Sequence, residues 1–183
     1  DADFGLSLNP ECIMPHSSLF DFYHGRGLDQ AFSGLAQVDA HGNVNVSKFG
    51  PKVPGCGGVI DLTQNARQLF FLGTFTAGGL EAEVSGGELH IRKDGRFCKF
   101  RNTIEQISFS SEYALKHDLP VLFITERAVL QLTHEGLLLT EIAPGVDLER
   151  DILAHMKCRP LVSGNLKHMD ARIFREEKMG LGK

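Results

Sequence analysis

The sequence predicts an α/β fold: an open, mostly parallel sheet with helices and an added antiparallel meander. Three observations predict it. The run 121–125 is short, continuous and apolar, which is typical of a strand covered on both faces. Short segments of helical character separate such runs. The runs 80–84, 88–92 and 96–100 alternate between polar and apolar residues and are divided by glycine turns, which indicates a three-stranded meander.

The N-terminal half supplies the first strands. Residues 19–23 alternate well enough for a strand or a helix end. A glycine turn at 24–27 then leads into an apolar strand at 31–38. A short alternating strand at 44–46 and a buried strand at 68–74 follow, with a polar helical turn between them.

The second half opens with a strand at 104–109. Ser110 is expected to cap a short helix over 111–116, because a serine hydroxyl accepts from the free amides of a first turn. The runs 128–132 and 137–142 are joined by a short glycine-containing turn, so a hairpin is expected there.

A last helix is expected at 147–155, because its acids come early and its large apolar residues share one face. Residues 160–162 are extended, and the polar tail from Lys167 is expected to fray or to pack on a neighbour. The 183 residues are enough for one domain with a sizeable core, so a single domain over 1–183 is expected.

Composition narrows the class of partner. The chain is 42% apolar and 23% charged, which is normal for a globular protein. Its net charge of −4 and the lack of a basic run argue against a nucleic-acid partner. No apolar run approaches the ~20 residues that cross a bilayer, so no membrane partner is expected. The first residue is Asp, which favours a piece of a longer chain, truncated at its N-terminal end.

The cysteines and histidines show no metal-binding pattern. Cysteines stand at positions 12, 56, 98 and 158, with no C-x-x-C pair. Free, mostly buried thiols in a reducing compartment are expected, and the start DADFG lacks a signal peptide, so a cytoplasmic location is expected. The eight histidines have no metal-ligand spacing, and no metal site is expected.

The stretch with the clearest chemical meaning is Gly55-Cys56-Gly57-Gly58. Glycine adopts positive φ and lets a ligand approach the backbone closely. A glycine cluster that opens a helix leaves N–H groups free to bind phosphate, carboxylate or a developing oxyanion. The alternative is an ordinary tight turn, which short glycine motifs often are.

Several other polar residues can be interpreted either as functional groups or as ordinary structural ones. Glu126 follows an apolar strand, where a carboxylate could act as a general base or could simply pair with Arg127; Glu141 poses the same choice. His24 and His41 lie in glycine turns, where they could touch a ligand or remain solvated. Cys56 has no histidine at a recognisable partner position, which favours an inert small residue over a nucleophile.

Several ordered motifs reveal a family resemblance that spans nearly all of the chain. They are DFGLSLNPE, FDFYHGRGLD, GLAQVDAHGNVNVSKFGPKVPGCGGVIDL, ITERAVL, LLLTEIAPGVDLERDIL and HMDARIF. Together they closely resemble family I coenzyme A transferases. The chain is similar to the C-terminal, or β-type, half of single-chain acyl-CoA:acetate/3-ketoacid CoA-transferases.

The resemblance implies a ping-pong transfer of CoA between short-chain acyl-CoA and a carboxylic acid, through mixed anhydrides and a glutamyl-CoA thioester. The family's oxyanion-hole amides would be those of Gly58 first and Gly57 second. Gly55 and Asn45 would contribute to substrate binding. CoA would be a substrate, and no cofactor is implied. The partners would be acyl-CoA, small carboxylic acids, the N-terminal half of the same enzyme, and further copies in a homo-oligomer.

One departure from the family pattern concerns the nucleophile. The family's catalytic glutamate precedes the segment that is Phe4-Gly5-Leu6-Ser7 here, so it would fall before Asp1. Glu11 lies on the wrong side of that segment and has no glycine context. The resemblance therefore implies no catalytic residue in this chain, an inactive isolated polypeptide and an open sheet edge.

Two other function classes remain open from the sequence. One is a noncatalytic module that binds CoA or acyl-CoA. The other is an intact α/β domain with a structural role in a larger assembly. A V-E-x-G motif upstream in the same reading frame would favour the transferase.

Overall fold

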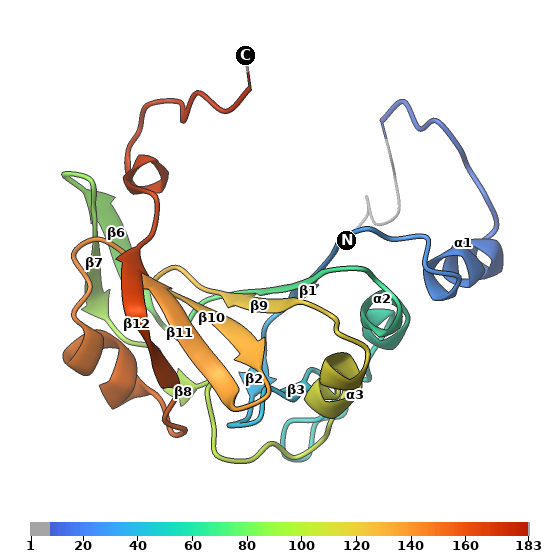
Figure 1. The fold of residues 1–183 in the computed structure, drawn as a ribbon, viewed down its shortest axis with the longest axis horizontal. Coiled ribbons are helices and arrows are strands. Elements are labelled where there is room, and N and C mark those ends of the chain that lie inside the picture. The colour runs from blue at the N-terminus through green and yellow to red at the C-terminus, as the bar shows by residue number, and fades with distance from the viewer. Residues whose placement is uncertain (1–7, 183) are drawn as a thin grey trace.

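The centre of the molecule is a six-stranded mixed sheet. The computed structural model describes residues 8–182, and the expected FGLS segment lies outside them. The strand order is β1-β4-β9-β10-β11-β12 (Figure 1). The strands are β1 (Ala31–Gly34), β4 (Leu69–Leu72), β9 (Val121–Ile124), β10 (Ala128–Thr133), β11 (Gly136–Ile142) and β12 (Leu161–His168). β1, β4 and β9 run parallel, as do β11 and β12, whereas β10 is antiparallel to both neighbours. The expected α/β fold with a mostly parallel sheet and added antiparallel strands is confirmed.

Three two-stranded ribbons decorate this sheet, and they correct the expected meander. They pair β2 (Gln37–Val38) with β3 (Val44–Asn45), β5 (Thr76–Ala77) with β8 (Phe97–Cys98), and β6 (Glu81–Ser85) with β7 (Glu88–Lys93). The third expected meander strand is β8, and it pairs with β5 instead of β7. The reason is a contact between two separate segments, because the Thr76 hydroxyl accepts from the Gly95 amide at 2.8 Å and donates to Asp94 Oδ1 at 3.3 Å. These bonds turn the chain back along β5.

The helices are short, and one of the expected helices differs from the prediction. They are α1 (His16–His24), α2 (Val59–Gln64), α3 (Ser111–Lys116), the π-helical turn η1 (Leu148–Ile152) and the 3₁₀ turns η2 (Leu153–His155) and η3 (Ala171–Phe174). The Ser110 cap is confirmed, since its hydroxyl accepts from the Tyr113 amide. The expected helix at 147–155 is η1 followed by η2, because Asp147 and Asp151 hold its first turn in a wider winding.

The segment at 104–109 was expected to be a strand and is not one. The amides of Ser108 and Phe109 both donate to the carbonyl of Val44, at 2.8 and 3.1 Å. Two neighbouring amides share one carbonyl, as in a β-bulge, and the pairing extends no further than one isolated bridge between Val44 and Phe109. The C-terminal segment is more ordered than expected, because β12 continues to His168 and Phe174 in η3 is buried.

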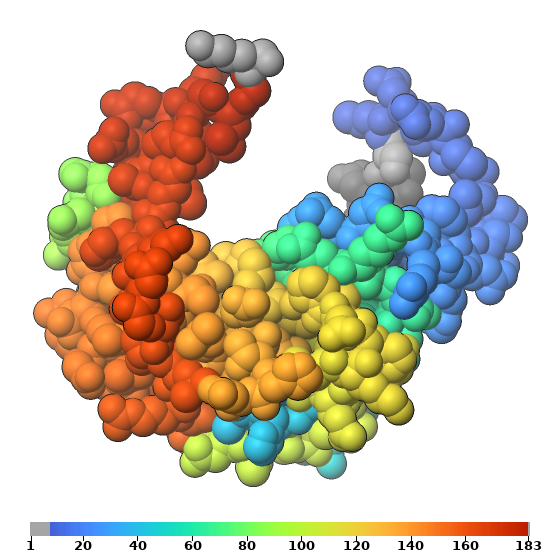
Figure 2. Space-filling model, in the orientation of Figure 1, coloured from blue at the N-terminus to red at the C-terminus, as the bar shows by residue number. Residues whose placement is uncertain are grey.

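The core lies on one face of the sheet. Phe71 of β4 packs between Phe109 and Phe123, with ring centroids 5.1 and 5.5 Å away. Val38 and Val44 of the β2–β3 ribbon are fully buried, and Ala114 of α3 is buried as well. The opposite face is not covered by residues 8–182, and Phe32 on β1 is 57% exposed there. Figure 2 shows the molecule hollowed between its N-terminal and C-terminal segments. Within residues 8–182, no helix is long and apolar enough to cross a membrane.

We predict that Phe71→Ala destabilises the protein by about 3–5 kcal/mol, because it removes a fully buried ring from between two others. Urea unfolding measures the change. Phe97→Ala is the matched control, because that ring is 61% exposed and its loss should cost well under about 1 kcal/mol. Equal effects of the two substitutions would contradict the placement of Phe71 at the centre of the core.

Candidate active site

The glycine loop leads directly into α2, and two of its amides have no partner within residues 8–182. Gly55 and Gly57 adopt positive φ of 82° and 53°, and Gly58 is the residue before the helix, at φ −83°. Neither the Gly57 nor the Gly58 amide donates a hydrogen bond to any residue in 8–182. Gly57 is exposed, and a Cβ added to it would meet nothing within 4 Å. The loop is therefore open to an approaching acceptor, and is not packed into the body of the protein.

Asn45 holds the chain that leads into this loop. It is fully buried, and its amide group donates to Gln37 Oε1 at 2.8 Å and to the Lys48 carbonyl at 2.6 Å. Its oxygen accepts from the amides of Ser47 and Lys48. The Ser47 carbonyl in turn accepts from the Gly55 amide at 3.3 Å. Both N–H groups and the oxygen of the Asn45 side chain are used in these hydrogen bonds. Asn45 therefore holds the turn before the loop and has no free donor or acceptor for a ligand.

Helix α1 lies against the loop and α2. The ring of Phe20 lies beside Gly58, where an added Cβ would meet it at 3.1 Å. His24, at the end of α1, pairs with Asp61 of α2, and its carbonyl accepts from Asn65 Nδ2 at 2.9 Å. The position of His24 is therefore explained by the α1–α2 contact. His41 lies in a different groove beside α3, where its backbone amide donates to Asp39.

Glu126 is committed to a buried network. Its Oε1 accepts from Arg127 Nε at 2.7 Å, and its Oε2 accepts from the Phe75 amide at 2.7 Å. The guanidinium of Arg127 is fully buried, donates to Asp94 and lies 5.1 Å from the Phe75 ring centroid. The sequence alternative of pairing with the neighbouring arginine is thus confirmed. Glu141 stands on β11 opposite Val129, and none of the ion pairs within the described residues involves it.

A cationic cleft of about 660 Å³ lies between the segments 35–37, 96–101 and Lys157. Arg96, Lys99, Arg101 and Lys157 line it, against the single acid Glu105. Lys99 donates to the Leu35 carbonyl at 2.9 Å, and burial lowers its pKa. The exposed ring of Phe97, beside the Arg96 guanidinium, adds an aromatic surface.

The cleft is linked to the turn that precedes the glycine loop. Gln37 and Phe49 line the cleft, and Gln37 is the residue that accepts from Asn45. The cleft was missed at the level of sequence, because its four cations are spread over residues 96–157 in a chain of net charge −4. The ITERAVL motif contains Glu126 and Arg127, whose pairing the sequence offered as one alternative. No local pattern predicted the cleft. Among residues 8–182, no group of three or more potential ligands could hold a metal ion.

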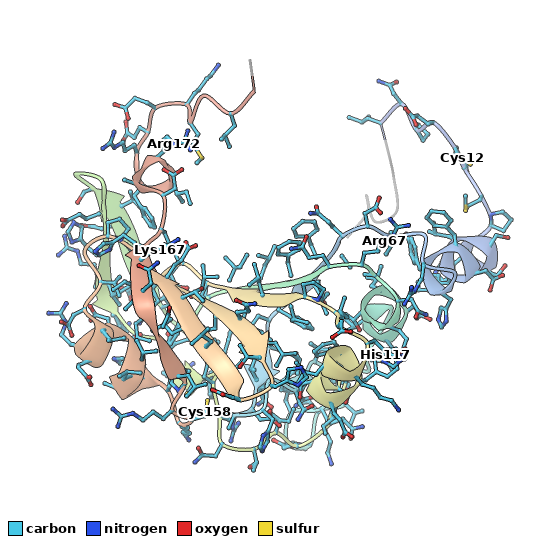
Figure 3. All side chains as sticks on the ribbon, in the orientation of Figure 1. Cys12, Arg67, His117, Cys158, Lys167 and Arg172 are labelled. Carbon is cyan, nitrogen blue, oxygen red and sulfur yellow. The ribbon has the colours of Figure 1, made fainter. Side chains whose placement is uncertain are left out.

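The cysteines occupy contrasting environments. All four are free thiols. Figure 3 shows Cys12 on the projecting N-terminal segment and Cys158 in the body of the molecule. Cys158 is buried, and the loss of solvation raises the pKa of its thiol to about 11. Cys56, between two loop glycines, is half-buried, and its carbonyl accepts from the Val59 amide at 3.1 Å.

We predict that iodoacetamide at pH 8 modifies Cys12 far faster than Cys158, because only the thiolate reacts and Cys158 is both buried and protonated at that pH. Peptide mass spectrometry resolves the two sites. Unfolding in urea is the control and should make the two rates equal. Comparable rates in the native protein would contradict the buried position of Cys158.

The fold of this chain is the fold of a domain found in CoA-transferases. It matches glutaconate coenzyme A-transferase from Acidaminococcus fermentans with a TM-score of 0.64 at 19% identity, over 87% of this chain and 62% of that one. At that identity the likeness concerns the fold alone. No family model matches the sequence.

Closer relatives make the likeness specific. The chain is 48% identical over 177 residues to acetate CoA-transferase YdiF of Escherichia coli, and 44% identical over 184 residues to caffeate CoA-transferase of Acetobacterium woodii. The crystal structure of the YdiF apoenzyme from E. coli O157:H7 superimposes with a TM-score of 0.95 over 97% of this chain, and its thioester complex with CoA superimposes with a TM-score of 0.94. The chain spans about a third of the length of these relatives, 33% and 35%. It is a homologue of a segment of these CoA-transferases.

Proposed function

We propose that this chain is the C-terminal part of a CoA-transferase that moves CoA between a short-chain acyl-CoA and a carboxylic acid. The observation that carries the proposal is the glycine loop, in which the amides of Gly57 and Gly58 donate to no residue in 8–182. The likeness to acetate and caffeate CoA-transferases supports it. The attacking glutamate would belong to polypeptide outside these 183 residues, as the family resemblance implies.

Each tetrahedral stage of this transfer would carry a negative charge on an oxygen atom, and the loop amides would donate to that oxygen. A glutamate oxygen attacks the thioester carbonyl, and the tetrahedral oxyanion collapses by breaking the C–S bond, which gives a mixed anhydride and CoA thiolate. The thiolate then attacks the glutamyl carbonyl and expels the first carboxylate, which leaves the glutamyl-CoA thioester. An acceptor carboxylate reverses the sequence. The amides of Gly57 and Gly58 would donate to the oxyanion at each tetrahedral stage.

The cationic cleft would hold the phosphate groups of CoA. CoA carries a diphosphate and a third phosphate on its ribose, so a ligand with several negative charges suits a cleft with four cations and one acid. Phe97 would provide a surface on which the adenine can stack. Gln37 joins the cleft to Asn45 and to the turn before the loop, so one CoA molecule would extend from the cleft towards the loop. Gly55 would act through the backbone by fixing the start of the loop, and Asn45 by fixing the turn that holds Gly55.

A noncatalytic CoA-binding module is the second candidate. It would use the cleft and loop equally well, but it would not require oxyanion donors. The curated relatives bear the names of transferases, which favours the first candidate. Transfer of CoA from acetyl-CoA to propionate by the full-length protein separates the two, because a binding module gives no turnover.

We predict that Gly57→Ala lowers kcat of the full-length enzyme by about 10²-fold, because the new methyl group would occupy the open space in front of the loop amides. Gly86→Ala is a matched control. Gly86 also has positive φ, 62°, and open space around its Cβ position, but it lies in the β6–β7 turn. Each substitution should cost about 1 kcal/mol of stability, since alanine resists this backbone conformation. Equal kcat values for the two variants would remove Gly57 from the site.

We predict that the double substitution R101Q/K157Q raises KM for acetyl-CoA by about tenfold while kcat changes little, since these cations would bind phosphates remote from the reacting carbonyl. Steady-state kinetics at varied acetyl-CoA measures both constants. The control is R92Q/K93Q on β7, which removes two cations from an exposed ribbon outside the cleft. An unchanged KM in the cleft variant would exclude this surface from CoA binding.

A further inference from the structure

Lys99 places one positive charge at the end of the cationic cleft that lies against the central sheet. Its ammonium donates to the Leu35 carbonyl at 2.9 Å, and a Cβ added to Gly73 would lie 3.2 Å from its Nζ. Leu35 directly follows β1, and Gly73 directly follows β4. The ammonium therefore lies beyond the carboxyl ends of two parallel strands, where open α/β sheets bind their ligands.

This ammonium has no ion-pair partner among residues 8–182. Only one of its three N–H donors is used there, on the Leu35 carbonyl. Glu126 attracts Lys99 electrostatically, but its two oxygens already accept from Arg127 and from the Phe75 amide. The loss of solvation outweighs this attraction and lowers the pKa of Lys99. A half-buried cation in this state is stabilised by an anion that binds beside it.

The lining around the ammonium suits a small carboxylate better than a phosphate. Leu35, Ala36 and Ala77 line this part of the cleft; the first is buried and the other two are half-buried. A short alkyl chain can lie against these apolar groups while its carboxylate accepts from the two remaining N–H donors of Lys99. A phosphate group carries more charge and more acceptor oxygens, and it calls for several donors at once.

The proposed transfer requires two anionic ligands at the same time. At the glutamyl-CoA thioester stage, CoA is still attached when the acceptor carboxylate enters. The site must then hold the phosphates of CoA together with a separate carboxylate. The cleft contains enough positive charge for both, because Arg96, Arg101 and Lys157 would remain for the phosphates when Lys99 pairs with the acid.

We propose that Lys99 binds the carboxylate of the acceptor acid, and that Leu35, Ala36 and Ala77 contact its short alkyl chain. The proposal rests on the proposed function, since it assigns the acid subsite of that transfer. Lys99 is then a specificity-determining residue, because its charge favours an acid over a neutral acceptor of the same size.

The test is steady-state kinetics of K99M in the full-length enzyme, with acetyl-CoA and propionate as substrates. We expect KM for propionate to rise by about tenfold or more and KM for acetyl-CoA to stay within about twofold, since only the acid loses a charge-assisted hydrogen bond. K99Q is a second neutral variant and should give the same result. The double substitution R101Q/K157Q should show the opposite pattern, with KM for acetyl-CoA raised and KM for propionate retained.

K99R tests whether charge is the cause. It keeps the positive charge and should hold KM for propionate within about threefold of the native value. Three results would overturn the proposal: equal rises in both KM values, no change in either, or a K99R variant as impaired as K99M. Equal rises would instead place Lys99 against a phosphate of CoA.

Saturation-transfer NMR of propionate, with the full-length protein and CoA, measures binding without turnover. We expect K99M and K99Q to lower the signal of bound propionate by about fivefold or more relative to the native protein. A protein that transfers no CoA but shows this loss would contradict the proposed function and retain the carboxylate site. A protein that transfers CoA and binds propionate equally well with and without Lys99 would overturn the carboxylate site alone.

Discussion

The direction in which the chain crosses from β1 to β4 and from β4 to β9 governs the rest of the structure. Both crossovers lie on one side, where Val44 of the β2–β3 ribbon and Ala114 of α3 belong to the same buried core as Phe71 and Phe123. Because of this crossover direction, the long connection between β1 and β4 lies on the face of the sheet that carries Phe71. The glycine loop lies at the end of that connection, immediately before α2 returns the chain to β4.

The position of the loop depends on polar contacts more than on apolar packing. Asn45 is buried with every hydrogen-bonding group used, and it fixes the turn whose carbonyl holds Gly55. A buried amide that lost one of these partners would carry a desolvation cost of about 1–3 kcal/mol, so the arrangement is strongly preferred. The two amides that follow are then left without partners among residues 8–182, at the point where the chain enters α2. Free donors on a fixed backbone are what a developing oxyanion requires.

Local patterns predicted those elements whose partners are near in sequence. The hairpin of β10 and β11, the cap at Ser110 and the pairing of Glu126 with Arg127 each depend on residues that are close to one another along the chain. The sequence predictions are wrong where contacts between residues far apart in the chain determine the strand pairing. The run 96–100 alternates like a meander strand, but Thr76 draws the chain towards β5. The run 104–109 looks like a strand, but one carbonyl of Val44 takes two of its amides.

By itself, the sequence determined the α/β class, the glycine loop and the likeness to CoA-transferases, because each of these is written in contiguous runs of residues. Only the tertiary structure decided that Asn45 is a buried support, that four scattered cations share one cleft with Phe97, and that residues 8–182 leave one sheet face partly exposed. These features arise from segments that the fold brings together across tens of residues. Charge and exposure at such places depend on chain topology, which no local pattern encodes.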